Sequence, residues 1–341
     1  MSITNKAGVY IIAEMSANHN HDINKALEIV YSAKNAGADC LKIQTYTADT
    51  MTIDSKNADF MIKGGLWDGY SLYDLYKEAY TPWEWQPRIK KECEKVGLDF
   101  LSTPFDRSSV DFLESMNVSM YKIASFEIVD IPLIRYIAGK GKPIILSCGM
   151  SSTDEINEAI EVMEDAGLTK DQIVLLKCTS AYPAIPSDMN LKTITDMKKR
   201  YGTLVGLSDH SIGDIAPVVA TSLGAKVIEK HFCLSRKENG PDNAFSSEPD
   251  EFKKMVDSVR QAYQALGGVS YGTGQTEAEN YKFRRSLYAI KDIAIGEVFS
   301  ESNIKSIRPG YGVAPKYFDK LIGQKSKCNY SKGTPISDKE I

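Results

Sequence analysis

The sequence lacks the features that mark several large classes of protein. It holds six cysteines in 341 residues, most of them inside apolar runs and none in a CxxC pair. Such cysteines favour reduced core thiols over a disulfide framework or a thiolate metal site. No window approaches 18 uninterrupted apolar residues, and the apolar stretch before Glu14 is too short for a signal peptide. We therefore expect a soluble, cytoplasmic protein.

Neither sign of charge is in large excess. The 41 lysines and arginines nearly balance 45 aspartates and glutamates, which gives a net charge of -4 and a pI near 5.7. The chain as a whole has no electrostatic attraction to nucleic acid or an anionic membrane, so an anion site must be local. A hydrophobic content of 43% is sufficient for an ordinary core and excludes a disordered or fibrous protein.

Short apolar runs alternate with segments of helical period over most of the chain. In the segment that ends at Gly37, Ala26, Ile29, Val30 and Ala33 recur at helical spacing. Another helix begins with the capping pair Ser152 and Glu155, and a last one ends at residues 267–268. The eight apolar runs are residues 9–15, 41–46, 100–105, 120–124, 144–147, 173–176, 204–207 and 227–232. This pattern predicts a (β/α)8 TIM barrel over residues 1–268.

Two segments fall outside the barrel pattern. Residues 47–81 are too long for a simple crossover and predict an insertion over the barrel mouth, ahead of a helix at 83–96. Residues 269–283 form a polar linker. Residues 284–341 contain short strand-like pieces broken by glycine and proline, which predicts a small β-rich domain.

Polar residues follow most of the predicted strands, where a barrel of this kind carries its chemistry. Two lysines and several hydroxyls at one mouth favour a phosphate or carboxylate site, because ammonium groups and O–H donors together suit a multiply charged anion. The residues at these ends are Glu14, Lys42, Gln44, Thr103, Lys122, Ser125, Glu127, Ser147, Ser180, Tyr182, Ser208, Asp209, His210, Lys230 and His231.

Two histidines stand at the ends of the last two predicted strands. His210 and His231 can meet near the barrel axis and bind a metal ion, leaving its other positions to water and substrate. The alternative is that each is an ordinary core or loop histidine. His19 and His21 form a competing pair, for which we expect a place at the start of a helix or along the mouth.

These residues, in this order, make the chain similar to the sialic acid synthase family, which condenses phosphoenolpyruvate with an acyclic amino-sugar aldehyde. The tail, with RPGYG at 308–312, resembles the antifreeze-like (SAF) domain of that family. The resemblance runs nearly end to end through AEMSANHN (13–20), LKIQT (41–45), STPFD (102–106), YKIASFE (121–127), ILSCGMS (145–151), CTSAYP (178–183), GLSDHS (206–211), EKHF (229–232) and GPDN (240–243).

The resemblance implies a role for each matching residue. His210 and His231 would bind a divalent metal, Mn2+ or Mg2+, and Glu14 or Glu127 would orient or deprotonate the attacking water. The positions implied for phosphoenolpyruvate are Lys42, Thr103, Lys122, Ser125, Ser147, Ser180 and Ser208, and those implied for the sugar are Glu14, Gln44, Tyr182, Asp242 and Arg308. Ser180 departs from the family, which often has asparagine there. Arg308 would act across a domain-swapped homodimer.

Within the family, the insertion at 64–85 and the serine of AEMSANHN resemble the pseudaminic acid synthase branch. The substrate implied is 2,4-diacetamido-2,4,6-trideoxy-L-altrose, whose apolar surface Trp67, Tyr70, Tyr73 and Trp83 could cover. The alternative is an N-acetylneuraminate or legionaminate synthase. A purely structural or ice-binding protein is a further alternative, which the charged residues at the strand ends disfavour.

Overall fold

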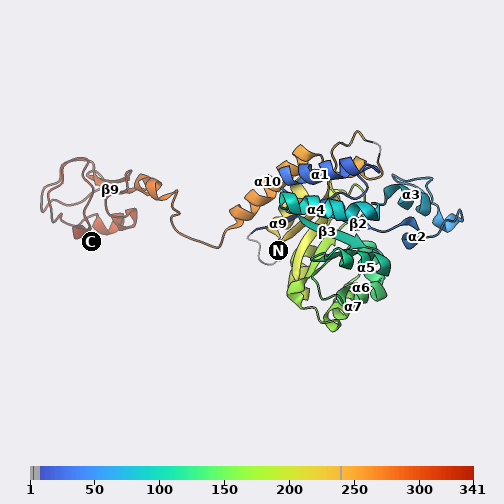
Figure 1. Cartoon of the computed structure of the whole chain (residues 1–341). Helices are drawn as coiled ribbons and strands as arrows, with labels where there is room; N and C mark the ends of the chain where they lie inside the picture. The colour runs from blue at the N-terminus through green and yellow to red at the C-terminus, as the bar shows by residue number, and fades with distance from the viewer. Residues whose placement is uncertain (1–2, 4–7, 239) are drawn as a thin grey trace. The chain divides into compact units, whose positions relative to one another are not determined.

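The computed structural model describes residue 3 and residues 8–341 except 239. The chain divides into two compact units, Met1–Gly267 and Gly268–Ile341 (Figure 1). All six cysteines are free, and all but Cys328 are buried. Within the described part of the chain, no helix has the length and apolar character needed to cross a membrane.

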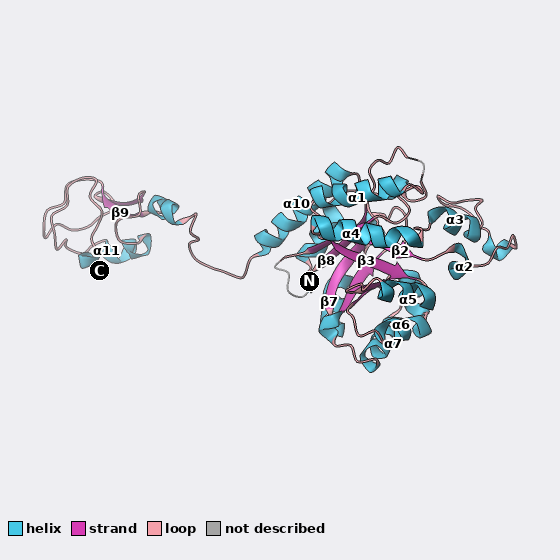
Figure 2. Ribbon diagram, in the orientation of Figure 1, coloured by secondary structure: helices cyan, strands magenta, loops and turns pink. Residues whose placement is uncertain are grey.

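The first unit is built on eight parallel strands whose order is β3-β2-β1-β8-β7-β6-β5-β4. Strands β3 and β4, at the two ends of this order, are also in contact, so the sheet forms a nearly closed barrel surrounded by helices (Figure 2). The predicted (β/α)8 barrel is confirmed. The strands are β1 (Tyr10–Glu14), β2 (Cys40–Thr45), β3 (Asp99–Pro104), β4 (Tyr121–Ile123), β5 (Ile144–Ser147), β6 (Ile173–Cys178), β7 (Leu204–Asp209) and β8 (Val227–His231).

The helices around the barrel bury the faces that the sequence predicts. In the first helix Ala26, Ile29, Val30 and Ala33 are all fully buried. In the last helix Phe252, Met255, Val256 and Val259 are buried, whereas Leu266 is half exposed because it lies in the final turn. The helices are α1 (Ile23–Asn35), α4 (Gln86–Val96), α5 (Arg107–Ser115), α6 (Ile131–Ala138), α7 (Thr153–Asp165), α8 (Thr193–Tyr201), α9 (Ile215–Ser222) and α10 (Pro249–Leu266).

The core has two layers because strand side chains alternate between the two faces of the sheet. The outward-facing side chains pack against the helices in one large cluster. The inward-facing side chains fill the lower part of the barrel with a smaller cluster, whose buried members are Tyr10, Ile12, Cys40, Leu101, Met120, Ile145, Val174, Leu176 and Val227. This inner apolar layer forms the floor beneath the barrel mouth.

The insertion between β2 and β3 consists of short helical segments joined by loops. It contains α2 (Ala48–Met51), η2 (Ala58–Phe60), α3 (Leu72–Ala79) and η3 (Trp83–Trp85). Ser71 caps the N-terminus of α3 by accepting a hydrogen bond from Asp74 N. The predicted helix at 83–96 is divided into η3 and α4, because Pro87 stands in the first turn of α4, where a proline needs no N–H partner.

The second unit has a core of its own under a two-stranded antiparallel sheet. Its strands are β9 (Ser286–Ala289) and β10 (Ile304–Ile307), and its one α-helix, among the described residues, is α11 (Phe318–Leu321). The core is made by Leu287, Ala289, Ile293, Phe299, Ile304, Val313, Leu321, Tyr330 and Ile336. Two of the strand-like pieces predicted for this segment therefore pair with each other.

Candidate functional site

The alternation of side chains decides which residues reach the barrel mouth. Tyr10 and Ile12 belong to the inner apolar layer, so Glu14 projects into the barrel directly above them. On the other strands, the residues that lie an even number of positions after a member of the inner apolar layer likewise project into the barrel and form a layer of polar side chains in the mouth. They are Lys42, Gln44, Thr103, Lys122, Ser147, Cys178, Ser208, His210, Glu229 and His231. Sequence reasoning missed Cys178 and Glu229, which the period of two counted from Leu176 and Val227 would have found.

Two other residues at the strand ends face away from the mouth. Asp209 and Lys230 have the opposite parity, and their side chains form a buried ion pair at 2.5 Å outside the barrel interior. Asp209 also accepts hydrogen bonds from the backbone N and hydroxyl of Ser211. This pair therefore supports the loops that carry the two histidines and does not enter the mouth.

A buried ion-pair network surrounds Lys42. Its Nζ lies 2.8 Å from Glu14 Oε2 and 3.3 Å from Glu229 Oε1, and it also donates to Thr103 Oγ1 at 3.4 Å. Burial raises the pKa of Glu14 to about 7, against the lowering effect of Lys42. Although burial acts in the opposite direction, Lys42 and Lys122 hold the pKa of Glu229 below its ordinary value. Glu14 therefore gains a proton near neutral pH much more readily than Glu229.

A second lysine lies among hydroxyl groups. Lys122 is buried, and its Nζ donates to Ser147 Oγ at 2.7 Å and to Ile123 O at 2.8 Å. Burial lowers the pKa of this ammonium group. An arriving anion would restore the charged form, because an opposite charge favours the ammonium ion.

Gly149 keeps space open beside these groups. Its N–H donates to Ser125 Oγ at 3.0 Å, and a Cβ at this position would lie 2.4 Å from Ser180 Oγ. Ser125, in η4 (Ser125–Val129), and Ser180 therefore approach each other across a position where only glycine fits. Hydroxyls, a lysine and a bare backbone form a cradle suited to phosphate oxygens.

The two histidines of the last strands meet as predicted, with ring centroids 5.4 Å apart. His210 Nδ1 lies 2.9 Å from Thr179 O, and because a carbonyl oxygen can only accept, Nδ1 carries the proton there. This leaves the His210 Nε2 lone pair available when the ring is neutral. The Nδ1 of His231 is buried without a hydrogen-bond partner, and burial together with His210 holds the pKa of His231 well below its ordinary value.

The rings of His210 and His231 fit a divalent metal ion that takes few of its ligands from the protein. No cluster of three or more His, Cys, Asp or Glu side chains in the described ranges is arranged to hold a metal ion. A pair of imidazoles would leave the remaining coordination positions to water and substrate oxygens. Although burial opposes it, the contact with Cys178 raises the pKa of His210, so a bound metal would compete with a proton.

Two carboxyl groups border the space above the mouth. The partly buried Glu127, in η4, has an Oε2 atom without a hydrogen-bond partner, and burial raises its pKa to about 7. Asp242 accepts a hydrogen bond from Ala17 N at 3.2 Å, and burial raises its pKa. Glu127 is therefore a carboxyl that can exchange a proton near neutral pH and whose Oε2 has no hydrogen-bond partner among the described residues.

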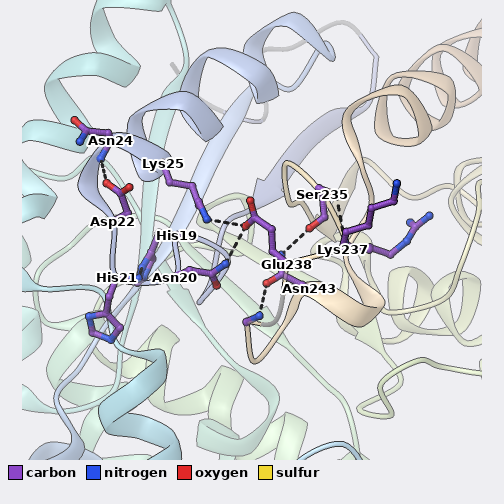
Figure 3. A network of polar contacts seen from close by, with 12 residues as sticks. His19, Asn20, His21, Asp22, Asn24, Lys25, Ser235, Lys237, Glu238 and Asn243 are labelled. Atoms are coloured by element: carbon purple, nitrogen blue, oxygen red, sulfur yellow. Dashed lines mark hydrogen bonds and ion pairs between the residues drawn. The ribbon is translucent and has the colours of Figure 1, made fainter.

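A polar network ties the loop that carries Asp242 to the loop after β1 (Figure 3). Glu238 accepts hydrogen bonds from Asn20 Nδ2 and Lys25 Nζ, both at 2.9 Å. Asn243 accepts from Gly240 N at 2.9 Å and donates to Ser235 O at 3.1 Å. These contacts fix Asp242 over the mouth.

The loop after β1 also holds the insertion, through His19. This histidine is buried, and its Nε2 lies 3.1 Å from Thr81 Oγ1, while its ring packs edge-on against Trp85. His21 packs edge-on against Tyr80. As expected, this pair lies just before α1. It anchors the insertion, and His210 and His231 remain the candidate metal ligands.

A cavity of about 360 Å³ lies above the mouth, between the barrel and the insertion. Its polar lining comes from the barrel strands and their loops: Ser16, Gln44, Glu127, His231 and Asp242. Its aliphatic lining comes from the insertion: Met51, Ile62, Leu72, Leu75 and Ala79. Aromatic rings complete it: Tyr46, Trp67, Tyr76, Phe105, Phe126, Tyr182 and Phe245.

The predicted aromatic wall is correct only for Trp67. Tyr70 is exposed, Tyr73 donates its hydroxyl to Asp49 at 3.1 Å, and Trp83 stacks on Phe112. None of these three lines the cavity: Tyr70 stands before α3, and the helical turn of α3 and the packing of η3 direct Tyr73 and Trp83 elsewhere. Sequence reasoning missed Tyr46 and Tyr76, which lie edge-on to each other at 5.8 Å in the wall itself.

Arg308 lies in the second unit, directly after β10, and its side chain is exposed. The structure describes this unit by itself, so the role of Arg308 at the sugar remains a prediction.

The fold and the mouth together define a class: a TIM-barrel enzyme whose mouth brings together buried lysines, hydroxyls and a histidine pair beside a cavity. The chain belongs to the NeuB family, whose model matches residues 29–271, and residues 284–341 match the SAF domain.

Three known proteins illustrate the similarity. A pseudaminic acid synthase of Campylobacter jejuni is 45% identical over 98% of this chain and 96% of its own. An N,N'-diacetyllegionaminic acid synthase of Legionella pneumophila is 35% identical over 96% of this chain and 93% of its own. A crystal structure of N-acetylneuraminic acid synthetase from Leptospira borgpetersenii superposes with a TM-score of 0.71 at 32% identity, covering 82% of this chain and 92% of that one.

Proposed function

We propose that the protein is a pseudaminic acid synthase, which condenses phosphoenolpyruvate with 2,4-diacetamido-2,4,6-trideoxy-L-altrose and water and releases phosphate. The observation that carries the proposal is the combination of a buried anion cradle with a largely apolar cavity directly above it. The higher identity to a pseudaminic acid synthase than to a legionaminic acid synthase, 45% against 35%, supports the choice of sugar.

The anionic substrate would occupy the lower part of the mouth. Lys42 and Lys122 would bind its negative charge, and the hydroxyls of Thr103, Ser125, Ser147, Ser180 and Ser208 would hold its oxygens. Lys42 already has two carboxylate neighbours, Glu14 and Glu229. Because the pKa of Glu14 is raised to about 7, a proton on Glu14 would reduce repulsion as the anion enters.

His210 and His231 would hold the divalent metal, Mn2+ or Mg2+. When bound, the metal supplies Lewis-acid polarisation of the sugar aldehyde oxygen. Titration of the wild type and of His210→Ala with Mn2+, followed by the paramagnetic signal of the free ion, tests this assignment independently of activity. Binding that is equally tight in both proteins would contradict it.

The chain's own residues would then manage the carbon–carbon bond and the water. C3 of phosphoenolpyruvate attacks the aldehyde carbon, C2 becomes electron-poor, and water adds to C2. The resulting tetrahedral centre expels phosphate by breaking its C–O bond. Glu127 is the better candidate to deprotonate the water, because this residue lines the cavity and its Oε2 has no hydrogen-bond partner, whereas Glu14 is paired with Lys42.

A comparison of three sugars tests the proposed function. Phosphate release from phosphoenolpyruvate is followed with the 2,4-diacetamido-2,4,6-trideoxy-L-altrose, with N-acetylmannosamine and with the legionaminate precursor. The kcat/KM should be highest for the altrose sugar by at least tenfold. A higher value for either of the other sugars would assign the chain to the alternative N-acetylneuraminate or legionaminate synthases.

A further inference from the structure

The cavity has two walls of opposite chemistry. The barrel wall presents carboxyls, an amide and His231, whereas the insertion wall presents the aliphatic side chains of Met51, Ile62, Leu72, Leu75 and Ala79. The other insertion residues that line the cavity are Trp67 and Tyr76. Trp67 Nε1 already donates to Pro241 O at 3.1 Å. Burial raises the pKa of Tyr76, and the negative charge of Glu127 raises it further. The Tyr76 hydroxyl therefore lies near the barrel wall.

The reaction orients the sugar between these walls. Its aldehyde carbon must meet phosphoenolpyruvate at the barrel wall, beside His231 and above the lysines. The far end of the six-carbon chain must therefore approach the insertion wall. A methyl group against Ile62, Leu72, Leu75 and Ala79 would be buried on aliphatic carbon, whereas a hydroxyl there would meet no polar atom of these four side chains.

We propose that Ile62, Leu72, Leu75 and Ala79 form a subsite for the C6 methyl group, which selects 6-deoxy sugars and rejects 6-hydroxy sugars. The inference rests on the proposed function and adds the residues that decide substrate choice. A hydrophobic pocket rejects a ligand that carries one added hydroxyl by about 100-fold, and we expect a preference of that order.

Trp67 holds the insertion wall against the loops of the barrel. Besides its hydrogen bond to Pro241 O, its ring packs edge-on against Tyr182 at 5.9 Å, and Tyr182 packs against His210 at 4.3 Å. The insertion wall is thereby connected to the loops that carry the reactive groups. Such contacts favour discrimination of a single hydroxyl, because a wall held by its neighbours leaves less room for a water molecule beside the ligand.

The test uses two sugars that differ by one oxygen: 2,4-diacetamido-2,4,6-trideoxy-L-altrose and its 6-hydroxy counterpart. The wild type should prefer the deoxy sugar by about 100-fold in kcat/KM. Ile62→Thr and Ala79→Ser each place a hydroxyl in the wall, where it can bond the 6-hydroxyl, and each should reduce the preference at least tenfold. The KM for phosphoenolpyruvate should stay unchanged in both.

Ala58→Ser is the matched control, because Ala58 lies in the insertion but is exposed and does not line the cavity. It should keep the wild-type preference. If Ile62→Thr loses stability, Ala79→Ser still decides the question, since it adds a single oxygen. A wild-type preference near one, or a strong preference that neither variant reduces, would overturn the subsite. Failure to convert either sugar would instead overturn the proposed function.

Discussion

A single glycine, Gly149, keeps the anion cradle open. Its backbone is not left-handed, so alanine would cause no backbone strain, but the added Cβ would lie 2.4 Å from Ser180 Oγ and 2.8 Å from Ser125 Oγ. We predict that Gly149→Ala folds normally and binds phosphoenolpyruvate about 10 to 100 times more weakly, the loss expected for one hydrogen bond to a charged group. Isothermal titration measures this affinity.

Gly268→Ala is the control for this variant, since nothing lies within 4 Å of its added Cβ. It should bind phosphoenolpyruvate as the wild type does. Equal affinity in the Gly149→Ala protein would mean that the substrate does not use the space between the two serines.

The acid–base behaviour of Glu127 gives a second prediction at this scale. Burial raises its pKa to about 7, and only the carboxylate can accept a proton from water. The value of kcat should therefore rise as the pH increases through about 7. Glu127→Gln should lower kcat by about 10² to 10⁴ and remove this rising limb.

The same experiment distinguishes the two candidate carboxyls, because burial also raises the pKa of Glu14 to about 7. A rising limb that persists in Glu127→Gln, together with a small change in kcat, would move the role to Glu14. The pH profile of the wild type alone would not separate them.

At the scale of elements, the insertion is held over the barrel by a few directional contacts. The hydrogen bond from Trp67 Nε1 to Pro241 O connects it to the loop after β8. Trp67→Phe keeps an aromatic ring in the cavity but removes this bond. We predict a rise of about tenfold in KM for the sugar with little change in KM for phosphoenolpyruvate, because the cradle is formed by other elements.

Trp83→Phe provides the matched comparison. Trp83 also donates its Nε1 to a backbone carbonyl at 3.1 Å, that of Tyr46, but its ring does not line the cavity. Both variants lose one tryptophan–carbonyl hydrogen bond. If the two raise the KM for the sugar equally, the effect reports loss of stability in the insertion and not the position of Trp67.

The elements differ in how far the sequence could predict them. The barrel strands were found because continuous apolar runs mark strands buried on both faces. The strand ends then gave most of the residues that meet in the mouth. Glu229 and Cys178 also project into the mouth, because each lies two residues after a member of the inner apolar layer, whereas a place at the end of a strand does not by itself show which face a residue occupies.

The insertion was the least predictable part, for a physical reason. Its helices are short, and α3 is stabilised by its Ser71 cap and by burial of Leu75 more than by a long periodic pattern. The sequence therefore indicated aromatic residues near the mouth without deciding their direction. Trp67 lies in the wall, whereas the neighbouring Tyr70 and Tyr73 do not. Only the fold of the segment separates them.

At the scale of the whole molecule, we propose a barrel domain at 1–268, a linker at 269–283 and an SAF domain at 284–341, assembled as a domain-swapped homodimer. Arg308 of one subunit would then serve the active site of the other. Arg308→Ala and His210→Ala homodimers should both be inactive. Random pairing of the two makes about half of the dimers mixed, each with one complete site, so about a quarter of wild-type activity should return.

Two different affinity tags allow the mixed dimers to be purified. Activity restored only in the doubly tagged fraction would support the exchange of domains between subunits. Purified mixed dimers that are as inactive as their parents would show that Arg308 does not act across the subunit interface.

The most direct test of the proposed reaction follows one oxygen atom. Phosphoenolpyruvate labelled with ¹⁸O at the bridging position is incubated with the enzyme, the divalent metal and 2,4-diacetamido-2,4,6-trideoxy-L-altrose, and both products are analysed by mass spectrometry. We predict a nine-carbon sugar acid that contains all three carbons of phosphoenolpyruvate, with the label entirely in the released phosphate. Recovery of unchanged sugar, or of label in the sugar acid, would contradict condensation with C–O cleavage in this barrel.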